Sequence, residues 1–510
     1  MGRARKGLLG IMGLAVALIA VLLGYGLLIS PSRDSAKQPG LDDGSILSAS
    51  PDLYPAFAWN RRDYVVRCSE TDDPVAQVAL PPGWQARPTD ARFASESFAV
   101  PLDSDHFTET DISLRRPAGR TGSFHIRCLP DDFPEFEFER YAPGGPRLVF
   151  AQVASDYAAF FDRNGTPVWW MKNNLPPLNP QVLGDDTLAW LVKQPGLEHL
   201  PPREAHGRYA YGIRDLDGKI VRYVKAADGA LTDAHELLLL PNGNYLIGTF
   251  DRNSDLDVSA FGGSPRARGL GARVEELTPG GKLVWKWNSD EHIKLAETKR
   301  WWEMVTGRPQ PYDYIHFNSA DPDGSSMVLS FRHLDAVYGI NRATGKILWK
   351  LGGTKTPESL KVLNDPYGSW PFGGQHDARI DHGVLSVFDN QTNLDRPPRV
   401  VRYRIDRQKH TATLISSFTD PEIPESSCCG SARQLPDGQW LVAWGGLGNI
   451  RDADIYNVVG AYGPKGRPIF RLRTFGKHMY RAQPVTGPFP SLSQLRGAMD
   501  EIESRTDDAG

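Results

Sequence analysis

The sequence lacks the features that mark several large classes of protein. It has no long run of basic residues and a formal net charge of −3, so its charge does not call for a nucleic acid partner. It has no Gly-x-x-x-x-Gly-Lys-Ser/Thr loop, the motif that cradles nucleotide phosphates. Cysteine is scarce, with 4 among 510 residues. The sequence therefore predicts neither nucleic acid binding nor a P-loop nucleotide site.

Glycine and proline, in contrast, are plentiful. The chain holds 50 glycines and 40 prolines, which indicates many turns, and many turns favour short strands. A chain of 510 residues is too long for one ordinary core. We therefore expect an all-β protein with two domains or one large repeat domain.

An apolar run from Leu8 to Ile29 follows Arg3, Arg5 and Lys6. As a helix, this uncharged run of 22 residues reaches about 33 Å, enough to cross a hydrocarbon core of about 30 Å. The basic flank favours a cytoplasmic N-terminus, and residues 30–33 make a poor signal-peptide cleavage site. We predict an uncleaved transmembrane helix over residues 1–29, rather than a removed signal, and a flexible stalk over residues 30–50. The globular part is then periplasmic or extracellular.

The four cysteines form two pairs. Cys68 and Cys128 each end a strand-like stretch, and an exported domain is oxidised, so we predict a disulfide between them. Two buried free thiols are the alternative. Cys428 and Cys429 are adjacent in sequence, and they suit a strained vicinal disulfide and a pair of small buried residues equally well.

Residues 51–145 alternate like strands without a repeat and predict a small β-sandwich. Residues 146–482 contain a repeated strand, tight turn and strand. The turn falls at Gly165, Gly218, Gly281, Gly345 and Gly466, with Gln408 in a weaker fifth copy.

A second hairpin precedes most of these units, as around Asn242-Gly243 and Asp437-Gly438. Two hairpins in each of six units predict a six-bladed β-propeller. An irregular β-solenoid and two sandwiches are the alternatives. Residues 483–510 form a C-terminal tail with a short helix candidate, Leu492–Ile502.

Polar residues recur at one position of the repeat. After an insertion of about 20 residues, Arg252 to Gly271, is discounted, four segments lie at similar distances before the following turn. We therefore expect them to enter the inner strand of successive blades and to face one axis. The segments are Asp233–Glu236, Tyr314–Ser319, Gly373–Asp377 and Cys428–Ser431, and they carry His235, His316 and His376.

Arg332 lies sixteen residues after His316, on a stretch that we predict to be a strand, and it reaches the same funnel. Strand alternation then sends His333 to the opposite face. Three histidines suit zinc, but a guanidinium repels a divalent cation and instead binds sulfate or phosphate through paired hydrogen bonds. We therefore favour an anion and proton site without metal.

Several of these segments together resemble the bacterial arylsulfotransferases, the nucleotide-independent aryl sulfate sulfotransferases. The resemblance extends over roughly residues 146–480. It rests on residues 235–243, 316–319, 330–338, 345–353, 375–379 and 388–390.

The resemblance implies a six-bladed propeller with an N-terminal β-domain that transfers a sulfuryl group from an aryl sulfate to a phenol, without a cofactor. It implies that His376 accepts the group as a transient sulfohistidine. It also implies that His235, His316, Asn318 and Arg332 bind the sulfate oxygens or assist proton transfer. We expect Ser431 to make a further axial contact.

Two other functions remain open from the residues alone. The first is a non-catalytic binding scaffold at the cell surface, a function for which the histidines would be dispensable. A quinone-dependent dehydrogenase shares the motif of residues 344–349 and the vicinal cysteines, but it needs carboxylates for calcium, and it usually has eight blades. The oligomeric state, including a homodimer, is also left open.

Overall fold

The computed structural model describes residues 46–105, 108–117, 119–154, 156–194, 196–197, 208–447, 456–476 and 479–507. Almost all regular structure in these ranges is β-strand, which confirms the predicted all-β class. The predicted transmembrane helix and residues 30–45 of the predicted stalk lie outside the described residues. Among the described helices, none is long and apolar enough to span a membrane.

The first strands form two sheets. One has the order β1-β3-β5, from Leu47–Ser50, Val75–Val78 and Phe98–Pro101. The other has the order β2-β7-β6-β4, from Asp63–Val66, Thr121–Cys128, Thr110–Arg115 and Gln85–Pro88. Strand β1 thus lies within the segment that the sequence assigns to the stalk, and it is fixed by pairing with β3.

The disulfide between Cys68 and Cys128 is present, as predicted. It lies where β2 and β7 pair in parallel, with Val66 opposite Cys128. The cross-link therefore holds the ends of two strands that are already neighbours.

Six further sheets follow along the chain. The first contains β9 (Leu148–Val153), β10 (Tyr157–Asp162) and β11 (Pro167–Lys172). The second contains β12 (Gln181–Val182), β13 (Leu188–Lys193), β14 (Tyr209–Arg214) and β15 (Ile220–Val224). The third contains β16 (Leu231–Leu239), β17 (Tyr245–Leu256), β18 (Ala267–Leu277), β19 (Leu283–Asn288) and the short β20 (Tyr312–Asp313).

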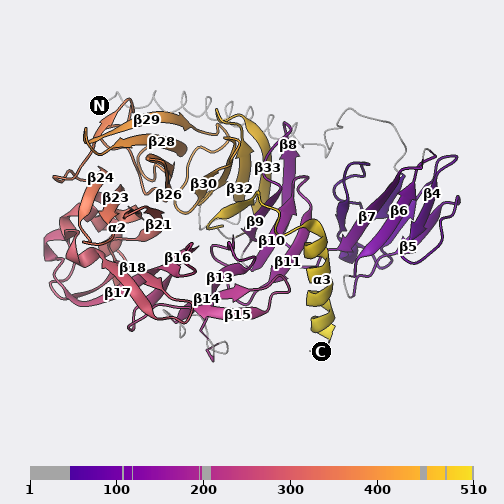
Figure 1. Cartoon of the computed structure of the whole chain (residues 1–510), viewed down its shortest axis with the longest axis horizontal. Coiled ribbons are helices and arrows are strands. Elements are labelled where there is room, and N and C mark those ends of the chain that lie inside the picture. The colour runs from indigo at the N-terminus through magenta and orange to yellow at the C-terminus, as the bar shows by residue number, and fades with distance from the viewer. Residues whose placement is uncertain are drawn as a thin grey trace, which may run out of the picture. The chain divides into compact units, whose positions relative to one another are not determined.

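The fourth sheet contains β21 (Phe317–Asp323), β22 (Ser326–Phe331), β23 (Ala336–Asn341) and β24 (Ile347–Gly352). The fifth contains β25 (Lys361–Leu363), β26 (His376–Asp381), β27 (Val384–Asp389), β28 (Arg399–Asp406) and β29 (Thr411–Phe418). The sixth contains β30 (Ser431–Gln434), β31 (Trp440–Trp444), β32 (Tyr456–Tyr462) and β33 (Pro468–Phe475). Figure 1 shows these sheets following one another around a common centre, while the number of blades stays a prediction.

The predicted tight turns join the third and fourth main strands of these sheets, as in the β10–β11 and β14–β15 hairpins. The five turn glycines all adopt φ between 71° and 80°, a backbone region that glycine enters without steric penalty. In the fifth sheet, which lacks this glycine, His410 takes the left-handed conformation, with φ 57°. Local turn chemistry therefore accounts for the repeat.

Segments from both ends of the chain complete two of the sheets. Strand β34 (Ala482–Val485) pairs with β9 in the first sheet, and β8 (Phe136–Arg140) pairs with β33 in the sixth. Helix α3 (Leu492–Asp507) starts where the sequence predicts and continues beyond Ile502. Its Leu495 and Met499 are buried in the core that includes β9 to β11. A second, short helix, α2, covers Trp302–Thr306.

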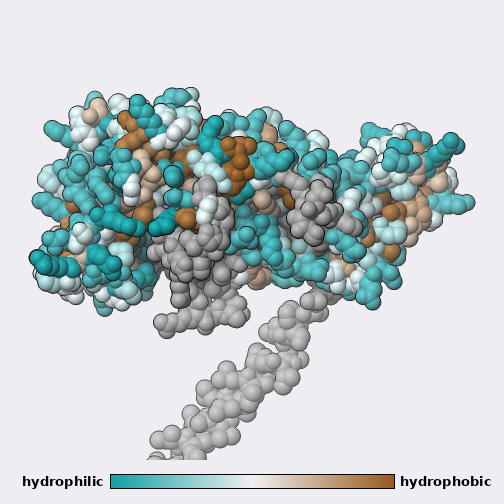
Figure 2. Space-filling view, turned by 90° about the horizontal axis from the view of Figure 1, so that it is seen from below, coloured by the Kyte–Doolittle hydropathy of each residue, from teal (hydrophilic) through white to brown (hydrophobic). Residues whose placement is uncertain are grey.

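The apolar residues of neighbouring sheets pack together. Phe150 on β9 stacks on Phe160 on β10 with ring centroids 4.0 Å apart, and Trp190 of the next sheet lies against them. The face in Figure 2 is mostly hydrophilic. Exposed large hydrophobic side chains among the described residues are few, namely Tyr141, Val221, Tyr223, Val284, Ile415 and Phe475.

Candidate active site

The four polar segments lie at the start of the first main strand of four consecutive sheets, as the repeat predicts. His235 lies on β16, His316 directly precedes β21, His376 opens β26 and Ser431 opens β30. In Figure 1 these strands line the centre, and the later strands of each sheet lie farther out.

Three of these strands carry a β-bulge at the site. The pairing register shifts between Thr232 and Leu237 in β16, between Phe317 and Ser319 in β21, and between His376 and Arg379 in β26. A bulge bends its strand and changes the direction of the side chains in it. The bulges therefore position the histidines at one centre instead of leaving them in the regular alternation of a strand.

The histidine rings lie close together in space. The ring centroids of His235 and His316 are 5.0 Å apart, and those of His316 and His333 are 4.6 Å apart. Tyr480 links the third predicted histidine to this group, because its ring lies 5.1 Å from His235 and 6.3 Å from His376. The sequence did not indicate Tyr480, which lies outside the repeated positions.

His376 is buried and fixed at both ring nitrogens. Its Nε2 accepts a hydrogen bond from the backbone N–H of Cys429 at 3.2 Å, so the ring proton lies on Nδ1 and is donated to Asn390 Oδ1 at 2.8 Å. Burial, followed by the charge of Arg332, holds the pKa of His376 well below its usual range. The ring is therefore neutral at pH 7, with a lone pair on Nε2.

His235 and His316 each have a carboxylate partner at Nδ1. For His235 the partner is Asp233, and although burial opposes the charged ring, this carboxylate raises the pKa of His235. For His316 the partner is Asp313, at 2.5 Å, but burial prevails and lowers the pKa of His316. One histidine of the group is therefore suited to carry a proton at neutral pH.

Arg332 is almost fully buried and is held from two sides. Its Nη2 donates to the carbonyl of Ser427 at 2.9 Å, and its Nη1 donates to His333 Nε2 at 2.7 Å. The guanidinium lies over Trp301, 4.4 Å from the ring centroid. Its Nε has no hydrogen-bond partner among the described residues, so this buried donor is available to an anion.

The prediction that His333 lies on the opposite face is wrong. The strand β22 ends at Phe331, and Arg332–Leu334 form a 3₁₀ turn, in which strand alternation does not apply. His333 therefore lies beside Arg332, and burial lowers its pKa well below the usual range.

The other two predicted residues take structural hydrogen bonds. Asn318 is buried, and its amide donates to the carbonyl of Gln375 at 2.8 Å, while its Oδ1 has no partner among the described residues. The Ser431 hydroxyl donates to the carbonyl of Ala482 at 3.2 Å. Asn318 thus ties β21 to the residue before His376, and Ser431 ties β30 to β34.

A network of buried charges lies next to the histidines. Arg379 contacts Glu236 at 2.6 Å and Asp377 at 2.9 Å, Arg433 contacts Asp377 at 2.7 Å, and Arg481 contacts Glu236 at 3.2 Å. The charges of Arg379 and Arg433 also act on Asp321, so these guanidinium groups are balanced by carboxylates. The donor that remains available to an anion is the free Nε of Arg332.

Asp313, His316 and His333 offer three possible metal-ligand atoms within 4.8 Å of one another. However, His333 Nε2 already accepts from Arg332, whose fixed positive charge opposes a divalent cation at this position. The geometry is therefore better suited to an anion than to a metal ion.

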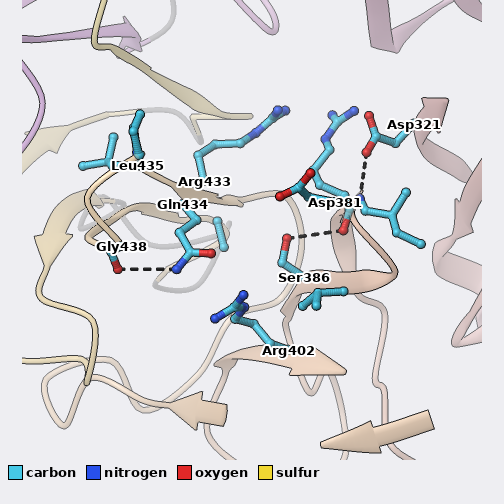
Figure 3. A pocket seen from close by; sticks show the side chains of 13 residues that line it. Asp321, Asp381, Ser386, Arg402, Arg433, Gln434, Leu435 and Gly438 are labelled. Atoms are coloured by element: carbon cyan, nitrogen blue, oxygen red, sulfur yellow. Dashed lines mark hydrogen bonds between the residues drawn. The ribbon is translucent and has the colours of Figure 1, made fainter. Parts of the chain in front are cut away.

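Two cavities lie near these strands. A cavity of about 550 Å³, shown in Figure 3, is lined by Asp381, Arg402 and Arg433 among others, and it lies at the end of β26 opposite to His376. A strand of this length spans about 16 Å, so the rim of this cavity at Asp381 is remote from His376, while Arg379 and Arg433 of the charge network line its inner side. A cavity of about 400 Å³ is lined by Asn390, Ser426 and Ser427, which contact the site directly. The second cavity is the one that adjoins the site.

These features define a class, an all-β protein whose sheets gather buried histidines around an arginine with a free buried donor, a set that suits an anion. The chain belongs to the arylsulfotransferase (ASST) family, whose model matches residues 139–470, well over half of the chain. The prediction from the sequence is confirmed at the level of the family, and this membership supports aryl sulfotransfer in general. No curated protein matches the chain.

Several solved structures are similar over about two thirds of the chain. A protein of unknown function from Bacteroides caccae has 11% sequence identity and a TM-score of 0.42, over 67% of this chain and 100% of that one. The periplasmic gluconolactonase PpgL of Pseudomonas aeruginosa has 12% identity and a TM-score of 0.35, over 67% and 99%. Apo AztD from Citrobacter koseri has 9% identity and a TM-score of 0.30, over 66% and 97%. All three TM-scores are below 0.5.

Proposed function

We propose that this protein transfers a sulfuryl group from an aryl sulfate to a phenol in two steps, with His376 as the nucleophile. Family membership supports the reaction class. The observation that carries the proposal is the neutral His376 ring, whose Nδ1 proton is held by Asn390 and whose Nε2 carries a lone pair within reach of the charge of Arg332.

In the first step the Cys429 N–H gives up its hydrogen bond to His376 Nε2, the freed lone pair attacks sulfur, and the bond between sulfur and the aryl oxygen breaks. The leaving phenolate takes the proton of His235, whose raised pKa favours the protonated ring. Asn390 Oδ1 accepts from Nδ1–H and so stabilises the positive charge that develops on the sulfated ring. Arg332 provides donors for the sulfuryl oxygens, which carry negative charge throughout the transfer.

In the second step the acceptor phenol attacks sulfur, and the nitrogen–sulfur bond breaks. A phenol has a pKa of about 10, so it needs a base near neutrality, and His235, now neutral, takes its proton. His376 then returns to its neutral state. Two such steps give parallel lines when the reciprocal rate is plotted against the reciprocal donor concentration at several acceptor concentrations.

The test is a chromogenic aryl sulfate assay with and without added phenol, on the wild type, His376→Ala and His382→Ala. His382 is an exposed histidine that follows the same strand, and its replacement serves as the matched control. We expect His376→Ala to lose at least about a thousandfold in both half-reactions, and His382→Ala to keep full activity. Near wild-type transfer by His376→Ala, with the fold intact, contradicts the assignment.

We also propose that the six sheets are the six blades of one propeller, and that residues 8–29 anchor it in a membrane with the rest of the chain outside the cytoplasm. The sheet order and the apolar run behind a basic flank support these proposals. Fractionation of cells tests the anchor. A mature chain that begins near Ser30 and washes off membranes contradicts it.

A further inference from the structure

Cys428 and Cys429 lie against the site and are close to bonding distance from each other. Their Sγ atoms are 2.6 Å apart, while a disulfide needs about 2.0 Å. Both residues are half-buried, and the cavity lined by Ser427 and Gly446 opens beside them. A small thiol reagent can therefore reach the pair.

The peptide between the two cysteines contacts the nucleophile. The Cys429 N–H, part of this peptide, donates to His376 Nε2 at 3.2 Å, and the Cys429 carbonyl accepts from Asn390 Nδ2 at 3.0 Å. The carbonyl of Ser427, one residue before the pair, accepts from Arg332. Three residues of the site thus depend on the position of this segment.

The fold supports the segment closely from behind. A Cβ at Gly445 would lie 2.7 Å from the Cys428 carbonyl oxygen, and a Cβ at Gly446 would lie 2.5 Å from the Cys428 nitrogen. Cys429 itself has φ 64°, a left-handed conformation that is unfavourable for a side chain other than glycine. Such strain persists only where the surroundings impose it, and it is concentrated at functional sites.

We propose that Cys428 and Cys429 are a redox modification site, in which a vicinal disulfide holds the Cys429 N–H in the position where it binds a sulfuryl oxygen during transfer. The effect on transfer rests on the proposed function, whereas the formation of the bridge does not.

The bridge forms by thiol–disulfide exchange with a small disulfide as the oxidant. The Cys428 thiolate attacks one sulfur of the oxidant, whose sulfur–sulfur bond breaks and releases one thiol. The Cys429 thiol then attacks Cys428 Sγ, closes the ring and releases the second thiol, so two electrons and two protons pass to the oxidant. The hydrogen bond from Cys429, together with the charge of Arg332, lowers the pKa of the Cys428 thiol to about 7, which makes Cys428 the attacking group.

The consequence for transfer follows from the position of the N–H. Once sulfur is bonded to His376 Nε2, the sulfuryl oxygens lie around the point where this N–H now meets the ring. A donor fixed in advance at that point stabilises the oxygen charge without reorganisation. The closed ring keeps the peptide in place, whereas two free thiols allow it to turn away.

The first arm of the experiment uses mass alone. The purified full chain is incubated with oxidised glutathione, then denatured, alkylated and digested without reduction. We expect the peptide that carries both cysteines to be unlabelled and lighter by two hydrogens, and to take up two labels after reduction. Two labels on this peptide without reduction overturn the proposal.

The second arm measures transfer by the wild type and by Cys428→Ser/Cys429→Ser, each before and after mild reduction. We expect reduction to slow the wild type at least about tenfold and to leave the double variant, already slow, unchanged. The double variant keeps the Cys68–Cys128 disulfide. A loss of rate on reduction that both proteins share is therefore caused by reduction of that disulfide and not of the Cys428–Cys429 bridge. Equal rates for oxidised and reduced wild type overturn the role in transfer, whereas absence of transfer in every state contradicts the proposed function and leaves the mass result valid.

Discussion

At the residue scale, the protonation states of four similar side chains are set by their partners. His235 faces a carboxylate and has a raised pKa, whereas His376 faces an amide and has a lowered one. His316 has a carboxylate partner, but burial outweighs the effect of this partner and lowers the pKa of His316. His333 accepts a hydrogen bond from a guanidinium. The proposed acid and the proposed nucleophile therefore differ in their neighbours and not in residue type.

The pH dependence of the donor half-reaction tests this division. His376 must be neutral, and because its pKa lies well below 6.5, the acid limb of kcat/KM lies below pH 6.5. His235 must be protonated, and because its pKa is raised, the alkaline limb lies above pH 6.5. Asn390→Asp places a carboxylate at Nδ1–H, which raises the pKa of His376 and moves the acid limb up by about one unit or more. Asn174→Asp, at an exposed position after the outer strand β11, leaves the profile unchanged. An unshifted Asn390→Asp profile contradicts the role of Asn390.

A second prediction concerns the shape of the Arg332 guanidinium. Two of its nitrogens are held by Ser427 and His333, and its Nε is free for the substrate. The single ammonium group of lysine cannot keep the contacts to Ser427 and His333 and also bind the substrate. Arg332→Lys should therefore lower kcat about a hundredfold with the fold intact. Steady-state kinetics with an aryl sulfate measure the effect, with the exposed Arg404→Lys as the control. A variant with normal kcat refutes the need for the planar group.

The sequence predicted part of the site for a physical reason. His235, His316 and His376 recur at one position of a repeat, and a repeat brings equivalent positions together. His333, Trp301 and Tyr480 were missed because none of them lies on a repeated element. His333 and Trp301 reach the site from 3₁₀ helices, and Tyr480 reaches it from the C-terminal segment.

At the element scale, turns were predictable and bulges were not. A tight turn depends on one residue that tolerates positive φ, and Gly165 and its equivalents mark it in the sequence. A bulge depends on how a strand pairs with its neighbour, so those in β16, β21 and β26 leave no local signal. The repeat therefore revealed the strands that carry the site, but not the irregularity that positions its side chains.

The Cys68–Cys128 bridge supports a prediction at this scale. The two cysteines are 60 residues apart, so in the chain-entropy model the bridge stabilises the N-terminal sheets by about 4 kcal/mol. Cys68→Ala/Cys128→Ala should lower the free energy of unfolding by about this amount, while the folded variant keeps its transfer activity. Urea unfolding, followed beside the aryl sulfate assay, measures both. An unchanged unfolding midpoint contradicts the prediction.

At the scale of the whole molecule, sheets are completed by strands distant in sequence. The first sheet takes β34 from beyond the last repeat, and the sixth takes β8 from before the first one. No local pattern specifies these pairings, so the sequence placed both segments outside the repeat. They unite the ends of the repeated region with its first and last sheets.

A buried position on β34 tests how much this closure contributes. Val485 is buried in the same core as β9, whereas Thr486 beside it is exposed. Val485→Asp buries an unpaired carboxylate and should destabilise the fold by about 3 kcal/mol or more, while Thr486→Asp should have little effect. Thermal melting of the two variants makes the comparison. Equal melting temperatures show that β34 is dispensable for stability.

The pairing of β34 with β9 also bears on how the protein is made. A ribosome delivers β9 early and β34 only after all the other sheets have emerged, so the first sheet has an unpaired edge during nearly the whole of synthesis. Contacts between such distant segments form slowly, because a long loop must close, at a cost in entropy, before the contacts stabilise the chain. The nascent chain therefore stays open until its last strand arrives, and this strand sets the moment at which the histidines can first work together.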